Sequence, residues 1–255
     1  APAAWADAAD PGGQRPAFAA AIGLRGGYGA EYLGADRRVV DANPAVYLRY
    51  GRVSISSASG LVDRRNDDVI RGLGIDLSRS EATRVGLSLR YDAGRSSAGK
   101  EGLAGIGGVS STLRVRASVQ RRFDGGFRLG AALNTDALGR DGGSVVELSA
   151  GVQRRLAAQW RWSAAATLSW GSERYMRSYF GVGADEANAA GLAPYLPPSG
   201  WRDVGLATQL RHDLSARWSV TGGVSIDRLL GPARDSPFTH SATNPGVSFG
   251  LIYWL

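Results

Sequence analysis

The sequence predicts an all-β protein: a single up-and-down antiparallel transmembrane β-barrel of about twelve strands. Three observations lead to this prediction. Apolar and polar residues alternate with a period of two, short and long connections alternate along the chain, and the two faces of the strands differ in chemistry. Together they are typical of a barrel whose outer face contacts lipid.

The alternation is clearest at 84–91, where Val85, Leu87 and Leu89 share one face and charged or small residues occupy the other. A helix would need apolar residues three and four positions apart, and this segment lacks that spacing. The same pattern recurs along the chain. The predicted strands are 17–31, 40–50, 53–61, 69–79, 83–93, 109–123, 127–137, 144–156, 160–171, 202–214, 218–229 and 245–255.

The connections predict how the barrel is oriented. Short connections lie at 51–52, 80–82, 124–126, 157–159 and 215–217, and long ones at 32–39, 62–68, 94–108, 138–143, 172–201 and 230–244. Outer-membrane barrels have tight periplasmic turns and longer outer loops. An even number of strands puts both termini on the turn side. We therefore expect a flexible periplasmic tail at 1–16 and a barrel over 17–255, with a long outer loop at 172–201.

One strand face is apolar, with aliphatic residues at mid-strand and aromatic residues towards both ends. Two aromatic belts around an aliphatic band match the two interfaces of a bilayer. The predicted belts are Phe18, Tyr50, Phe123, Phe127, Trp160 and Trp218 on the turn side, and Tyr32, Tyr91, Trp170 and Trp201 on the loop side.

The opposite face is too charged for a protein core, because burying unpaired ions is costly. A narrow, wet lumen accommodates such charges far better. The predicted lumen-lining residues are Arg25, Arg49, Arg84, Arg90, Arg114, Arg116, Arg122, Arg128, Arg155, Arg161, Arg211, Glu147, Asp76 and Asp227, together with Glu31, Asp136, Asp203 and Asp213. The surplus of arginine predicts that an open lumen prefers anions, and that replacing Arg114 and Arg116 by Gln lowers this preference without unfolding.

Composition excludes several classes of protein. The chain has no Cys and only two His, which excludes a disulfide scaffold, a thiol nucleophile and a multi-His metal site. No apolar run is long enough for a transmembrane helix, and no nucleotide-binding or metalloprotease motif occurs. The net charge of +7 does not indicate nucleic-acid binding, because parity places the arginines inside the barrel. We predict no cofactor and no metal.

The two histidines are the available catalytic bases. His212 falls on the apolar face near a short turn and is interpreted as an interfacial residue. His240 lies in an outer loop with Asp235 and Ser236, but a nucleophile and a base on one mobile loop lack rigid support. Asp235, Ser236 and Pro237 are more simply a turn. The sequence therefore predicts that the protein is not an enzyme.

The long loop 172–201 combines aromatic, apolar and basic residues with a Pro-rich return. Exposed apolar residues in a loop usually pack on another surface. Two interpretations stay open: the loop plugs or covers the barrel mouth, or it forms a surface for a ligand or partner.

Several segments resemble, in order, the MipA/OmpV family of MltA-interacting proteins, over about 22–255. They are GGYGAEYLGADRRV at 26–39, YMRSYFGV at 175–182, WRDVGL at 201–206 and RWSVTGGVSIDRLLGPARDSPFT at 217–239. Ala35 and Pro232 depart from the commoner Ser and Asp. The resemblance marks an outer-loop motif of Tyr175, Met176, Tyr179, Phe180, Gly181, Asp235, Ser236 and Pro237.

The resemblance implies a protein of the outer membrane of a Gram-negative bacterium, exported with a cleaved signal peptide and surrounded by outer-membrane lipid. It also implies a scaffold that brings a lytic transglycosylase to a penicillin-binding protein. Against this, the periplasmic turns are short and offer little surface. The alternative, favoured by the lumen residues, is a narrow Arg-lined channel for small anionic solutes.

Overall fold

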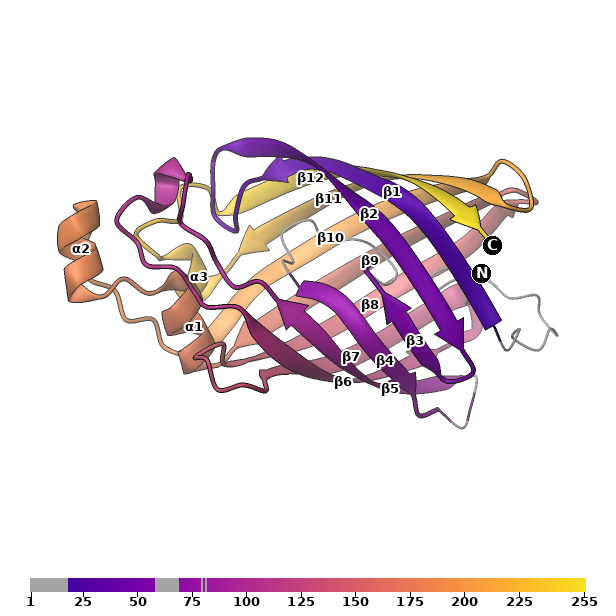
Figure 1. Cartoon of the computed structure of the whole chain (residues 1–255), viewed down its shortest axis with the longest axis horizontal. Helices are drawn as coiled ribbons and strands as arrows, with labels where there is room; N and C mark the ends of the chain where they lie inside the picture. The colour runs from indigo at the N-terminus through magenta and orange to yellow at the C-terminus, as the bar shows by residue number, and fades with distance from the viewer. Residues whose placement is uncertain (1–17, 58–68, 79, 81) are drawn as a thin grey trace.

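The computed structural model describes residues 18–57, 69–78, 80 and 82–255, so the tail predicted at 1–16 lies outside the described residues. The described chain forms a closed barrel of twelve antiparallel strands (Figure 1). Each strand pairs with its neighbours in sequence, and β1 closes the ring against β12. This confirms the predicted all-β, up-and-down barrel.

The elements follow one another as the alternating connections predict. The strands are β1 (Phe18–Ala30), β2 (Arg38–Tyr50), β3 (Val53–Ser56), β4 (Val69–Asp76), β5 (Thr83–Asp92), β6 (Thr112–Arg122), β7 (Phe127–Asp136), β8 (Ser144–Ala157), β9 (Trp160–Gly171), β10 (Gly200–Asp213), β11 (Trp218–Leu229) and β12 (Thr243–Trp254). The helical segments are η2 (Glu101–Leu103), η3 (Asp124–Gly126), α1 (Glu173–Phe180), α2 (Ala184–Ala190) and α3 (Gly231–Arg234). Among the described helices, none has the length and apolar character needed to cross a bilayer.

Some predicted strand boundaries are wrong, and the loops explain why. β6 begins at Thr112 rather than at 109, because Val109 pairs with Arg95 in an isolated bridge that belongs to the outer loop. β3 was expected to run to 61. Its described part ends at Ser56, and 58–61 lie outside the described residues.

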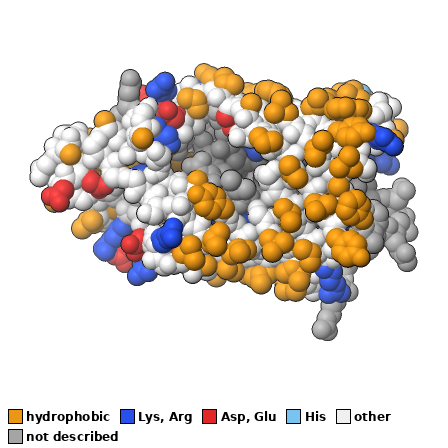
Figure 2. Space-filling model, viewed as in Figure 1, with side chains coloured by type: hydrophobic (Ala, Val, Ile, Leu, Met, Phe, Trp, Pro, Cys, Tyr) orange, Lys and Arg blue, Asp and Glu red, His pale blue; other side chains and the backbone are white. Residues whose placement is uncertain are grey.

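The strands present their apolar face outwards. In β5, Leu87 and Leu89 are 42% and 41% exposed, while Ser88 between them lines a chamber inside the barrel. Figure 2 shows hydrophobic side chains spread over the strands of the visible face and charged side chains gathered towards the two ends. An outer face of this kind is stable only in contact with lipid or detergent.

The aromatic belt at the turn end has the expected exposed residues, and it accounts for the position of His212. The ring of His212 stacks on Trp160 with centroids 4.2 Å apart, so this histidine lies among the interfacial aromatics. At the loop end, one belt prediction is wrong. Tyr32 is only 7% exposed, because the outer loops fold over it.

The two larger clusters of buried apolar residues lie at the loop end of the barrel, where α1, α2 and α3 gather to the left in Figure 1. A third, small cluster of Ala21, Tyr47 and Ile252 lies among β1, β2 and β12. Strand β1 begins and strand β12 ends at the opposite, turn end. Gly143 shows how tightly the loops pack. Its φ of 57° suits glycine, and a side chain there would collide with the backbone of Tyr175 in α1.

Candidate functional site: the capped mouth and the basic rim

Four outer loops, 31–37, 93–111, 172–199 and 230–242, pack together over the mouth of the barrel, and we call them the cap. Although the loops are distant in sequence, they share one apolar core. Its buried members are Ala30, Tyr32, Ala35, Leu103, Ile106, Val182, Ala187 and Phe238. A loop set with a common core of its own is an ordered structure rather than a mobile fringe.

Helix α1 is the part of the cap that fills the mouth. The side chain of Ser172 accepts a hydrogen bond from the backbone N–H of Tyr175 and so caps the start of the helix. The helix then buries Tyr175, Met176 and Phe180 against the barrel wall. Of the two interpretations left open for 172–201, these contacts correspond to the plug.

The two halves of the predicted outer-loop motif meet in the cap. Ser236 is 4% exposed and its Oγ donates a 2.7 Å hydrogen bond to the carbonyl oxygen of Phe180. Gly181 ends α1, donating its N–H to the carbonyl of Arg177. Asp235 instead forms an exposed ion pair with Arg234 at 2.9 Å. The bond between Ser236 and Phe180 therefore joins two loops of the cap, whereas Asp235 lies on its surface.

Arg95 ties three loops of the cap to one another. Its guanidinium donates to the carbonyl oxygens of Tyr179 at 2.7 Å and Gly107 at 2.9 Å, and it lies 4.8 Å from the centroid of the Phe238 ring. Burial lowers the pKa of Arg95, while the neighbouring Glu186 carboxylate raises it. The alternation of strand residues gave no reason to single out Arg95, because Arg95 lies beyond the end of β5.

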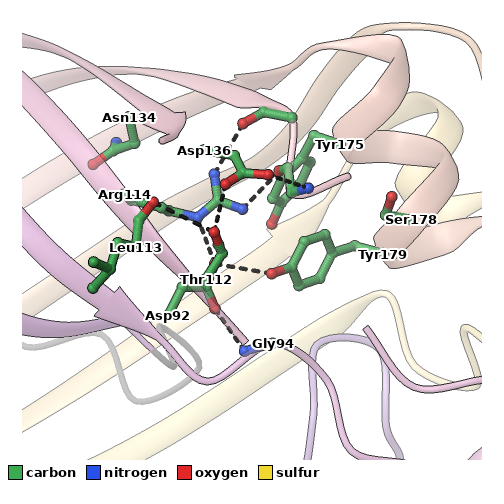
Figure 3. Close-up of polar contacts among 12 residues, drawn as sticks. Asp92, Gly94, Thr112, Leu113, Arg114, Asn134, Asp136, Tyr175, Ser178 and Tyr179 are labelled. Carbon is green, nitrogen blue, oxygen red and sulfur yellow. Dashed lines mark hydrogen bonds and ion pairs between the residues drawn. The ribbon is translucent and has the colours of Figure 1, made fainter. Parts of the chain in front are cut away.

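Beneath α1 lies an ion pair that connects the cap to the barrel wall; Asp92, Arg114 and Tyr179 form what we call the latch (Figure 3). Asp92 and Arg114 are 3% and 2% exposed and form a direct ion pair. The Tyr179 hydroxyl donates to Asp92 Oδ2 at 2.9 Å. Arg114 also donates to the carbonyl oxygen of Gly142 at 2.7 Å. Every member is satisfied by a partner, as a buried polar network requires.

Arg202 forms a second contact between wall and cap, and sequence reasoning missed it. Its guanidinium pairs with Asp203 and donates to the Tyr175 hydroxyl at 2.8 Å. Strict alternation would place Arg202 opposite to Asp203. The pairing of β9 and β10 shifts register between Trp201 and Asp203, and this irregularity brings both side chains inside.

The structure places the predicted lumen residues in three environments. Arg49, Arg90, Arg114, Arg128, Arg211 and Asp227 are buried, and Arg25, Asp76, Arg84, Arg116, Arg122, Glu147 and Arg161 are partly buried. Arg155 is exposed at the turn end. It pairs directly with Arg161 and so keeps the parity of the lumen face, but it lies at the end of β8, on the rim rather than inside the lumen.

Below the latch, the barrel encloses a chamber of about 420 Å³. Arg116 pairs there with Glu147, and Glu147 also accepts a 2.8 Å hydrogen bond from Asn134. The charged residues lining it are Asp76, Arg84, Arg90, Arg116, Glu147 and Asp227. Because Arg114 and Arg116 each have a carboxylate partner, we expect replacement of both by Gln to lower the stability of the barrel as well as its anion preference.

The turn end of the barrel carries a ring of exposed arginines, which we call the basic rim. Its members are Arg52, Arg121, Arg154, Arg155 and Arg217. Among the described residues of this end, Asp124 is the one exposed acidic side chain. The rim is therefore strongly positive, and it is the surface that faces the periplasm in a barrel of this orientation.

The ionisation of Tyr32 tests the packing of the cap. Its hydroxyl donates to the carbonyl oxygens of Gly102 at 3.2 Å and Phe238 at 3.4 Å. Burial, and then the carboxylates of Asp36 and Glu31, raise the pKa of Tyr32 to about 12. Because the pKa of this phenol is higher in the folded than in the unfolded chain, the neutral phenol contributes its full stabilisation at pH values below the ordinary pKa of about 10. This contribution is lost as the pH rises through the folded-state pKa of about 12.

We expect the ultraviolet difference titration between the native chain and Tyr32→Phe to show one phenol ionising near pH 12. A midpoint near the ordinary value of about 10 would contradict the buried position of this side chain.

In the part of the chain that the structure describes, no group of three or more His, Asp and Glu residues could hold a metal ion. The polar clusters found there are ion pairs and hydrogen-bonded networks at the cap, in the chamber and at the rim.

A closed barrel with an apolar outer belt, short turns at one end and long loops at the other defines an outer-membrane β-barrel protein. A sequence profile described as "MltA-interacting protein MipA" matches residues 22–254. The chain therefore belongs to the MipA family, which confirms the resemblance seen in the sequence.

Two curated relatives share this family description. The MltA-interacting proteins of Escherichia coli (strain K12) and Shigella flexneri are each 29% identical to this chain over 86 residues, which is 34% of this chain and 34% of the relative. The matching part thus spans about a third of the length of these relatives.

Solved structures of outer-membrane channels are similar to the chain at low sequence identity. The channel DcaP of Acinetobacter baumannii is 9% identical, with 93% of this chain and 96% of that chain covered and a TM-score of 0.44. The NanC porin is 10% identical, with 92% and 100% covered and a TM-score of 0.45. The toluene transporter TodX of Pseudomonas putida is 9% identical, with 100% and 92% covered and a TM-score of 0.44.

Proposed function

We propose that the protein is an interaction protein of the outer membrane, and that its basic rim binds a lytic transglycosylase. Family membership and the name of the curated relatives, MltA-interacting protein, support this role. The single observation that carries it is the contrast between the two ends of the barrel. The outer end is filled by the cap, while the turn end exposes arginines with few acidic neighbours.

The rim also answers the objection that short turns offer little surface. The rim residues come from the hairpins β2–β3, β6–β7, β8–β9 and β10–β11, so the charges are distributed around the barrel end rather than on one turn. Clustered charge of one sign accelerates association with an oppositely charged partner, an effect that salt screens. The partner that fits this surface is a periplasmic enzyme with an acidic face.

The test is binding of a purified lytic transglycosylase to the barrel in lipid nanodiscs. We expect the variant with Arg52→Glu, Arg155→Glu and Arg217→Glu to bind with an association rate about 10-fold lower at low salt. A matched control variant carries the same Arg→Glu change at three outer-loop positions, Arg37, Arg140 and Arg174. It should bind like the native chain. Addition of a bifunctional penicillin-binding protein then shows whether a ternary complex forms.

Equal binding by the rim variant and the control would contradict the rim as the docking surface. If the native barrel binds no transglycosylase at any salt concentration, the scaffold function is wrong.

The surplus of arginine over carboxylates on the lumen face favours one second candidate, a channel for small anionic solutes. The chamber itself is balanced, with three arginines and three carboxylates, so this surplus lies on the rest of the lumen face; the cap lies between the chamber and the outside. Conduction therefore requires release of the cap. In a variant whose residues 173–198 are replaced by a short Gly/Ser linker, we expect the reversal potential across a salt gradient to indicate chloride over potassium. A preference for potassium would contradict the charge argument.

A further inference from the structure

The lipid-facing surface of the barrel has a groove of about 640 Å³ across β7 to β11. Large side chains bound it, and they point outwards: Leu129, Leu206 and Val224 are 54%, 56% and 54% exposed. The floor is formed by Ala150, Ala164, Ala166 and Val152. Most of these positions would carry larger aliphatic residues in a smooth lipid face, so the alanines create the depression.

The turn end of this groove carries a cation. Phe127 lines the groove and is 53% exposed, and the guanidinium carbon of Arg154 lies 5.5 Å from the centroid of its ring. The turn beneath is η3, where Gly125 has φ of 69°. A side chain at Gly125 would meet Arg154 Nη2 at 3.2 Å, so glycine leaves room for the guanidinium over the turn.

We propose that the groove and Arg154 together bind a glycerophospholipid of the inner leaflet of the outer membrane. One acyl chain lies along the alanine floor, and the phosphate accepts hydrogen bonds from the guanidinium of Arg154. An apolar groove with an arginine at its interfacial end matches the two chemistries of such a lipid, because arginine forms strong charge-assisted hydrogen bonds with phosphate. The turn end of the barrel meets the inner leaflet, which determines where this lipid comes from.

The site shares Arg154 with the basic rim but otherwise lies apart from the surface proposed for the transglycosylase. Its apolar part lies on β7 to β11 inside the membrane, and its cation is stacked on a lipid-facing ring. Asp124 in the same turn is exposed and adds a negative charge near the phosphate position. Removal of this carboxylate should therefore tighten binding, an effect that a purely apolar groove would not show.

The experiment is native mass spectrometry of the purified chain, with phosphatidylglycerol added in detergent. We expect one retained lipid per native chain. Arg154→Gln should lower the apparent affinity about tenfold, as expected for loss of a charge-assisted hydrogen bond. Ala166→Phe, which fills the groove, should abolish retention, and Asp124→Asn should increase it. Two matched controls should retain lipid like the native chain: Arg121→Gln, whose guanidinium stacks on Phe123 outside the groove, and Ala117→Phe on β6.

Several results would overturn the proposal. Equal retention by the groove variants and the controls would show that the lipid binds the general apolar belt. If Arg154→Gln retains lipid as tightly as the native chain, the phosphate contact is wrong. If the native chain is a dimer that Ala166→Phe converts to a monomer, the groove holds a second copy of the chain. The transglycosylase test changes Arg52, Arg155 and Arg217 and leaves Arg154 in place, so that proposal can fail or succeed independently of this one.

Discussion

Replacing Arg114 by Gln is expected to destabilise the folded barrel by about 3–5 kcal/mol, because removal of one partner leaves a buried charge unpaired. The side chains of Arg114 and Asp92 are 3% and 5% exposed. The substitution also removes the donors to the carbonyl oxygens of Gly142 and Gly143, at 2.7 and 3.1 Å. Tyr179 loses its orientation as well, since it donates to the same carboxylate. The effect should therefore reach the cap.

The barrel is incubated in lipid vesicles with increasing denaturant concentration. The fraction that remains folded is then measured on gels from its heat-modifiable mobility. The control is Arg174→Gln. Arg174 is 68% exposed and lies 3.9 Å from Asp141, so its loss should cost less than about 1 kcal/mol. If both variants unfold at the same denaturant concentration, the latch does not stabilise the protein. Combining Arg114→Gln with Asp92→Asn should recover part of the loss, because the second change removes the unpaired charge.

Placing arginine at Leu87 should destabilise the barrel by about 2–4 kcal/mol, the cost of a cation near the bilayer midplane. Leu87 lies on the outer face and is 42% exposed to the surroundings, which are lipid for this protein. Ser88, its neighbour in β5, lines the inner chamber. Ser88→Arg introduces the same side chain into a polar space and should cost much less.

The two variants form a matched pair because they differ by one position on one strand. Their unfolding midpoints in the same vesicles compare the two faces directly. Equal destabilisation would mean that the assignment of faces is wrong, since a membrane-facing and a chamber-facing arginine have different solvation.

The barrel itself could be predicted from the sequence because a strand has a simple repeat. Each side chain in a regular strand points opposite to its neighbours, so Leu87 and Ser88 are assigned once the period is recognised. The assignment fails where the repeat is interrupted. The irregularity beside Trp201 breaks the alternation at Arg202 and Asp203, and no sequence signal marks it.

The cap could not be predicted in the same way because its contacts are non-local. Helix α1 has only eight residues and is stabilised by burying Tyr175, Met176 and Phe180 in the mouth, rather than by its own propensity. Tyr32 has the pattern of a belt residue, and only the arrangement of the four loops buries it. The aromatic content of 172–201 indicated that this segment packs on something, but not on what.

We place the function at the basic rim because the cap closes the barrel. The conductance of the intact chain in a planar lipid bilayer tests this closure most directly. The packed apolar core and the latch predict no steady single-channel current for the native protein at moderate voltage. The variant lacking residues 173–198 should conduct under the same conditions. A steady, ohmic current through the native chain, equal to that of the variant, would contradict a closed mouth and favour the anion channel.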